Sequence, residues 1–147
     1  MANDNGDAMP GEVRVRSNFV YIANFLAVAP AATPTVVVNI DSSAEFYWIK
    51  SAYMADIAGA AQTDATRVVP NVDVQIQLGG ADKLLLQGNT PIPSVFGTGQ
   101  IPGVWAFPQK LVRSSVVTFT LASREAANTL NIRLALIGWK DYGKLTR

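Results

Sequence analysis

Residues 111–140 read LVRSSVVTFTLASREAANTLNIRLALIGWK, and this stretch decides the fold. In residues 117–121 apolar side chains alternate with threonines, and after a polar run the same alternation returns in residues 130–136. Because successive side chains of a strand point to opposite faces, each run has one apolar face and one mixed face. Two such runs around a short polar connection predict an antiparallel pair, which we expect to be the central hairpin of a β-sandwich. The connection lacks Asn-Gly and Asp-Gly, so we expect a loop longer than two residues.

More strands are predicted upstream of this stretch. Residues 72–78 (VDVQIQL) show the cleanest alternation in the chain, and residues 35–40 (TVVVNI) and 45–53 (EFYWIKSAY) are rich in β-branched and aromatic side chains. Residues 13–15 form a short edge-like strand, and residues 19–28 (FVYIANFLAV) are apolar on both faces, which indicates a strand buried or covered by a partner. About eight strands and no clear helix predict an all-β fold, an antiparallel, jelly-roll-like β-sandwich.

Three segments do not have a strand pattern. Residues 1–12 are polar and acidic and carry no base, so we expect a flexible N-terminal arm before a single β-sandwich domain at residues 13–147. The alternative is an arm that becomes ordered against a neighbouring subunit. Residues 55–66 are alanine-rich and are expected to form a loop. Residues 90–108 contain four prolines, which predicts a long ordered connection rather than a central strand.

Composition excludes several classes of function. Hydrophobic residues make up 49% of the 147 residues and charged residues only 16%, against about 25% in an average protein. A surface so poor in charge favours cover by a partner. The net charge of +1 gives no reason to expect direct binding to nucleic acid or to an anionic membrane. The polar first residues are unlike a signal peptide, and no apolar run is long enough to cross a membrane, so we expect a soluble protein made in the cytoplasm.

The chain also lacks the usual residues of catalysis. It has no cysteine and no histidine, which excludes disulfides, thiol catalysis and the commonest general base and metal ligand. The Gly97-Thr98-Gly99 triplet has no strand-to-helix context, so a phosphate-binding loop is not indicated. We therefore expect no enzymatic activity, no cofactor and no metal.

Aromatic side chains are the candidate binding residues. Such residues anchor interfaces when they are exposed. The expected interface set is Phe19, Tyr21, Phe25, Phe96, Trp105 and Phe107. A second hypothesis is that aromatic side chains form a platform that binds a sugar. These residues are Tyr47, Trp48, Trp105 and Trp139.

Three segments, in this order, resemble a known family. They are VVVNIDSSAEFYWIKSAY, then PIPSVFGTGQIPGVWAFPQK, then VVTFTLASREAANTLNIRLALIGWK. This order is similar to small virion structural proteins of tailed bacteriophages, especially head cement or decoration proteins, over roughly residues 35–142. It is a resemblance of pattern, without a signature motif.

The resemblance implies a β-sandwich that binds the assembled major capsid protein and stabilises the lattice, without catalysis. It also implies a homo-oligomer, dimer or trimer, located on the capsid surface of the virion and made in the host cytoplasm. Two alternatives remain open: a carbohydrate- or receptor-binding β-sandwich module, and a head-tail or tail structural protein.

Overall fold

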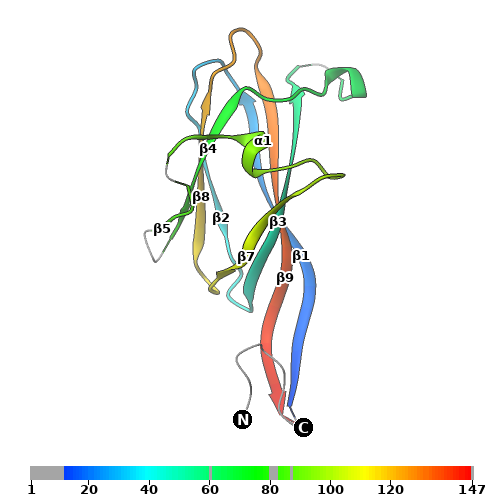
Figure 1. Cartoon of the computed structure of the whole chain (residues 1–147), viewed down its shortest axis with the longest axis vertical. Coiled ribbons are helices and arrows are strands. Elements are labelled where there is room, and N and C mark those ends of the chain that lie inside the picture. Colours follow the sequence, from blue (N-terminus) through cyan, green and yellow to red (C-terminus); the bar gives the residue numbers. More distant parts are fainter. Residues whose placement is uncertain (1–11, 60, 80–82, 87, 147) are drawn as a thin grey trace.

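The structure is a computed structural model that describes residues 12–59, 61–79, 83–86 and 88–146 (Figure 1). The described residues are almost entirely β-structure. One short helix, α1 (Ile92–Val95), and a 3₁₀ turn at Asp64–Thr66 interrupt the strands. The strands are β1 (Glu12–Val28), β2 (Thr35–Asn39), β3 (Glu45–Ile57), β4 (Val72–Leu78), β5 (Lys83–Leu84), β6 (Thr90–Pro91), β7 (Gly103–Leu111), β8 (Val116–Ser123) and β9 (Leu130–Thr146).

The strands form two antiparallel sheets packed face to face. One sheet has the order β1-β9-β3-β7, and the other has the order β2-β8-β4-β5, with β6 also paired to β4. Since β5 and β6 pair with opposite ends of β4, they occupy one strand position between them. The first strand therefore pairs with the last, β2 with β8 and β3 with β7, as in a jelly roll. The predicted all-β sandwich is confirmed.

The predicted hairpin within residues 111–140 is wrong. β8 pairs with β2 and β4, whereas β9 pairs with β1 and β3 in the other sheet. Residues 124–129 therefore pass from one sheet to the other. The apolar rows of the two strands belong to the same core. Alternation of period two is the same whether two strands pair side by side or lie in facing sheets.

Other boundaries also differ from the prediction. The two strands expected at residues 13–15 and 19–28 are one strand of 17 residues, β1. β3 continues to Ile57, three residues into the loop predicted at residues 55–66. Part of the Pro-rich connection is a strand, β7, which lies at the edge of its sheet. Pro108 is tolerated there because an edge strand has one side without ladder hydrogen bonds. The arm expected at residues 1–12 lies outside the described residues except for Glu12, which begins β1.

Aromatic side chains fill the space between the sheets. Trp48, Phe96 and Phe119 have no solvent-exposed surface. The ring of Phe119 lies 6.2 Å from that of Trp48 and 6.2 Å from that of Phe96, both in edge-to-face geometry. The indole nitrogen of Trp48 donates hydrogen bonds to the carbonyl oxygen of Lys50 and to the hydroxyl of Ser51, so its polar atom is satisfied inside the core.

A β-bulge in β3 makes a glycine necessary in β9. Trp48 pairs with Gly138 and Lys50 with Ile137, which leaves Ile49 without a partner in the ladder. At this point the strands are so close that a Cβ atom on Gly138 would lie 1.8 Å from the carbonyl oxygen of Tyr47. Any side chain at this position would push the two strands apart.

We predict that Phe119→Ala lowers the free energy of unfolding by about 3–5 kcal/mol, because it leaves a cavity between the sheets. Phe107→Ala is the matched control, since the Phe107 side chain is 76% exposed and should cost little. Chemical denaturation of both variants measures the difference. A Phe119→Ala protein as stable as the wild type would contradict the assigned core.

We predict that Gly138→Ala lowers the free energy of unfolding by about 1–3 kcal/mol, because the new methyl group collides with the backbone of β3. Gly88→Ala should have little effect, since a Cβ there meets no atom within 4 Å. Thermal unfolding of the two variants measures this contrast, and equal melting temperatures would show that the strands are not in close contact at the bulge.

Candidate interaction face

The two sheets present different surfaces to solvent. The outward side chains of the β2-β8-β4 sheet include Thr118 and Thr120 on β8 and Gln75 and Gln77 on β4. In the other sheet the outward side chains of the central rows are mostly apolar, and polar or charged side chains lie toward the ends of the strands. We call this second surface the apolar face, and it is formed by Val20, Ile22, Ala52, Met54, Val104, Ala135 and Ile137.

The apolar face is organised in rows that cross the strands. Val20 pairs with Ile137, Ile137 with Lys50, and Lys50 with Val104, so one row spans all four strands. The next row joins Ile22 to Ala135 and Ala52. Apolar residues in cross-strand neighbours form a continuous surface, whereas scattered apolar residues would not.

Alternation within β1 explains why its sequence is apolar on both faces. Tyr21, Ala23 and Phe25 point inward and are buried. The residues that alternate with them point outward. Of these, Val20 and Ile22 are 44% and 51% exposed. In a single copy of the chain, the second sheet covers the inward side chains of β1. No other described residue covers its outward side chains.

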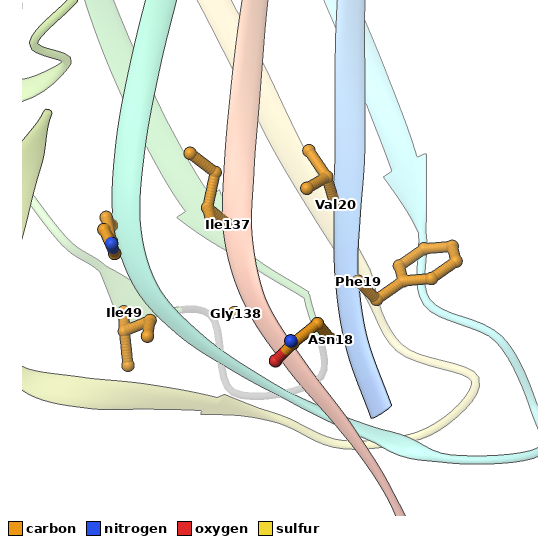
Figure 2. A pocket seen from close by; sticks show the side chains of 7 residues that line it. Asn18, Phe19, Val20, Ile49, Ile137 and Gly138 are labelled. Carbon is orange, nitrogen blue, oxygen red and sulfur yellow. The ribbon is translucent and has the colours of Figure 1, made fainter. Parts of the chain in front are cut away.

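A shallow hollow lies in the apolar face. It has a volume of about 570 Å³ and is lined by Asn18, Phe19, Val20, Ile49, Lys50, Ile137 and Gly138. Figure 2 shows Val20, Ile137 and Ile49 on three neighbouring strands, with the Phe19 ring directed away from them. A second hollow of about 320 Å³ shares Asn18 and continues toward the termini, with Arg16, Ser17 and Trp139 in its walls. The two hollows provide a site for an extended segment.

Basic side chains border this face without matching acids. Among the described residues Lys50 forms no ion pair with a carboxylate, and Arg133 donates a hydrogen bond to the amide oxygen of Gln62, at 3.2 Å. The acids nearby are already paired. Arg16 lies 3.7 Å from the buried carboxylate of Asp141, and Lys110 lies 3.2 Å from Glu45. The face therefore combines apolar side chains with an excess of positive charge.

Lys140 forms a separate, structural cluster on the inner side of the sheet. It is only 5% exposed, its ammonium lies 3.6 Å from the centre of the Phe19 ring, and it donates a hydrogen bond to Asp41. Burial alone would lower the pKa of Lys140, but the hydrogen bond to Asp41 and nearby negative charge outweigh burial and raise it above the ordinary value of 10.5. The ion pair thus stabilises the fold fully below pH 10.5, and this contribution is lost as the pH rises through the raised pKa.

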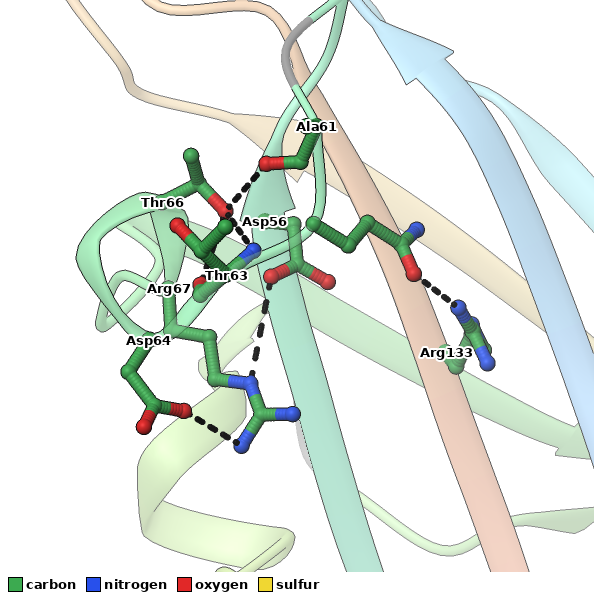
Figure 3. Close-up of polar contacts among 8 residues, drawn as sticks. Asp56, Ala61, Thr63, Asp64, Thr66, Arg67 and Arg133 are labelled. Carbon is green, nitrogen blue, oxygen red and sulfur yellow. Dashed lines mark hydrogen bonds and ion pairs between the residues drawn. The ribbon is translucent and has the colours of Figure 1, made fainter.

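A second polar cluster orders the chain after β3 (Figure 3). The Thr66 hydroxyl lies 2.9 Å from the carbonyl oxygen of Thr63 and 3.3 Å from that of Ala61, and its single proton can be donated to either. Arg67 Nε lies 4.0 Å from the buried carboxylate of Asp56, and Arg67 Nη1 lies 3.7 Å from Asp64. The guanidinium occupies the position that a cation would take between these acids. Within the described residues no group of three His, Cys, Asp or Glu side chains could hold a metal ion.

The structure distributes the expected interface residues over different environments. Tyr21, Phe25 and Phe96 are buried in the core of one copy, and Phe19 and Trp105 are half-buried against it. Phe107 remains strongly exposed, on β7. Sequence reasoning missed Val20 and Ile22, although the run that is apolar on both faces contained the signal. Val104 had no comparable signal, because its position depends on the pairing of β7 with β3. Met54 had none because it lies next to the start of the predicted loop, in the part of β3 that pairs with β9.

The four aromatics of the sugar hypothesis do not form one platform. Trp48 is in the core, and the ring of Trp105 meets it edge-on at 5.0 Å. Tyr47 and Trp139 lie together on the outward side of the sheet, stacked at 5.4 Å with an angle of 15° between their planes. The four aromatics thus form two separate pairs, one in the core and one on the outward side of the sheet.

Comparison with protein-family models, with curated proteins and with solved structures found no match for this chain. In the described part of the chain, no helix has the length and hydropathy that a membrane crossing requires.

We predict that Asp41→Ala destabilises the protein more than Lys140→Met does. Removing Asp41 leaves a buried ammonium without its partner, which should cost about 1–2 kcal/mol because Asp41 is itself half exposed. Lys140→Met removes the charge and keeps an apolar side chain against Phe19. Denaturant titration at neutral pH compares the two, and the reverse order would show that the ion pair itself is the main stabilising element.

Proposed function

We propose that this protein is a non-enzymatic structural protein of a phage virion, a capsid cement or decoration protein that binds and stabilises the major capsid protein lattice. The observation that carries this proposal is the contrast between the two outer surfaces of the sandwich, one polar and the other apolar. An apolar face of contiguous rows is the kind of surface that interacts with other subunits. The sequence resemblance to phage head decoration proteins favours the capsid lattice as the assembly that this face contacts.

The jelly-roll strand order supports the same proposal. Double-sheet jelly rolls are common in viral capsid domains and in lectins. A rigid two-sheet body can present one broad surface to a lattice without any catalytic site. The edge strand β7 contributes Val104 and Phe107, which are 71% and 76% exposed, and aromatic residues of this kind anchor interfaces. We assign the contact with the capsid lattice to β7.

Cementing follows from differential binding. A protein that binds the assembled lattice more tightly than free capsid subunits stabilises the lattice by that difference in affinity. Because the contact is repeated over many copies, each one can be weak and the combined stabilisation still large. Particles without the protein should therefore assemble, and should be less resistant to heat.

A carbohydrate- or receptor-binding module is the second candidate. The stacked pair of Tyr47 and Trp139 favours it, because it lies beside the hollow that Arg16, Ser17 and Asn18 line. A head-tail or tail structural protein is a further alternative.

The number of copies per particle separates a cement protein from a receptor binder, since the first is present in hundreds of copies and the second in few. Gel densitometry of purified particles measures it.

We predict that particles depleted of this protein release their DNA at a lower temperature than complete particles, and that added wild-type protein restores the resistance. Phe107→Asp should fail to restore it, because a charge on β7 would lie in the proposed contact. Gln77→Asp is the matched control, an exposed position on the opposite sheet, and should restore it fully. Depleted particles as heat-resistant as complete ones would contradict the proposed function and favour the receptor-binding alternative.

A further inference from the structure

The charges of the apolar face decide what can cover it. Lys50 lies in the row of Val20, and Arg133 lies in the row of Asn24 and Met54. Packing this face on the same face of a second copy would place an excess of positive charge on both sides of the interface. Juxtaposed like charges disfavour such an interface. The segment that best matches the apolar face is acidic, to pair with Lys50 and Arg133, and has small or flexible apolar side chains.

The chain itself contains such a segment. Residues 1–12 read MANDNGDAMPGE, with carboxylates at Asp4, Asp7 and Glu12, no lysine or arginine, and four apolar alanine and methionine side chains. Residues 1–11 lie outside the described residues. We propose that this acidic segment of a neighbouring copy lies along the apolar face, with Asp4 and Asp7 beside Lys50 and Arg133.

The spacing of the charges fits this arrangement. On β9, Ile137 faces Lys50, and Arg133 is four residues further along the strand. At about 3.3 Å per residue the two basic positions are separated by roughly 14 Å, counting one strand spacing. Asp4 and Asp7 are about 9 Å apart in a polyproline II conformation, whose period of three residues directs both carboxylates to the same side. The length of the lysine and arginine side chains covers the difference.

The segment of the same copy is too short for both contacts. Asp4 is eight residues before Glu12, so it lies at most about 29 Å from the start of β1. Asn24, in the row of Arg133, is twelve residues into β1, or about 40 Å away. The segment's own carboxylates could therefore reach the row of Lys50 at best. A neighbouring copy has no such limit, and mutual exchange between two copies gives a closed pair.

This inference concerns contacts between copies over the β1, β9 and β3 part of the apolar face, whereas the proposed function assigns lattice binding to the β7 edge of the same sheet. The test is sedimentation equilibrium of the full chain, with charge reversals on both sides of the contact. Asp4→Lys with Asp7→Lys, and Lys50→Glu with Arg133→Glu, should each weaken self-association by about tenfold, and the combined four-site variant should recover most of it. Added salt should weaken the wild-type association.

Arg113→Glu is the matched control, because it makes the same charge change in the exposed turn between β7 and β8 and should leave association unchanged. Thermal unfolding of every variant checks that the sandwich is intact. Failure of the combined variant to recover association would overturn the proposal, as would a wild-type protein that stays monomeric at high concentration. Phe107→Asp distinguishes lattice binding from self-association, since it should abolish heat protection of particles and leave self-association intact.

Discussion

Apolar contact between the inner faces of the two sheets is the interaction on which the rest of the structure depends. Phe119 on β8 packs edge-on against Trp48 on β3 and against Phe96, and the inner residues of β8 and β9 belong to the same core. Because β8 and β9 lie in different sheets of this core, each pairs sideways with other strands, and those strands complete the two sheets. The close approach of β3 to Gly138 and the Trp48 hydrogen bonds fix the register on one side of this core.

The same arrangement gives the molecule two unlike outer surfaces. Each strand uses one face for the core, so the character of its other face is free to vary. On β8 and β4 the outward positions include two threonines and two glutamines, whereas on β1, β9 and β3 they include Val20, Ile137 and Met54. A single copy thus has a polar side suited to solvent and an apolar side suited to assembly, with basic residues along it that favour an acidic partner.

Much of the fold was predictable from the sequence, and the site was less so. Alternation in β4, β8 and β9 predicted strands because one face of each is buried. It did not show that β8 and β9 belong to different sheets, since facing and pairing strands have the same period. Aromatic residues such as Phe96 suggested an interface, but large apolar side chains also fill cores, and burial is decided by tertiary packing. Val104 was not predictable, because its place depends on a bulged pairing with β3.

Accessibility of single cysteines in purified particles tests the central claim, that the apolar sheet is the side used in assembly. The chain has no native cysteine, so Val104→Cys and Gln77→Cys each provide one thiol, on the apolar sheet and on the polar sheet. Maleimide should label both variants in free protein and only Gln77→Cys in particles. Labelling of Val104→Cys in particles together with protection of Gln77→Cys would contradict the account.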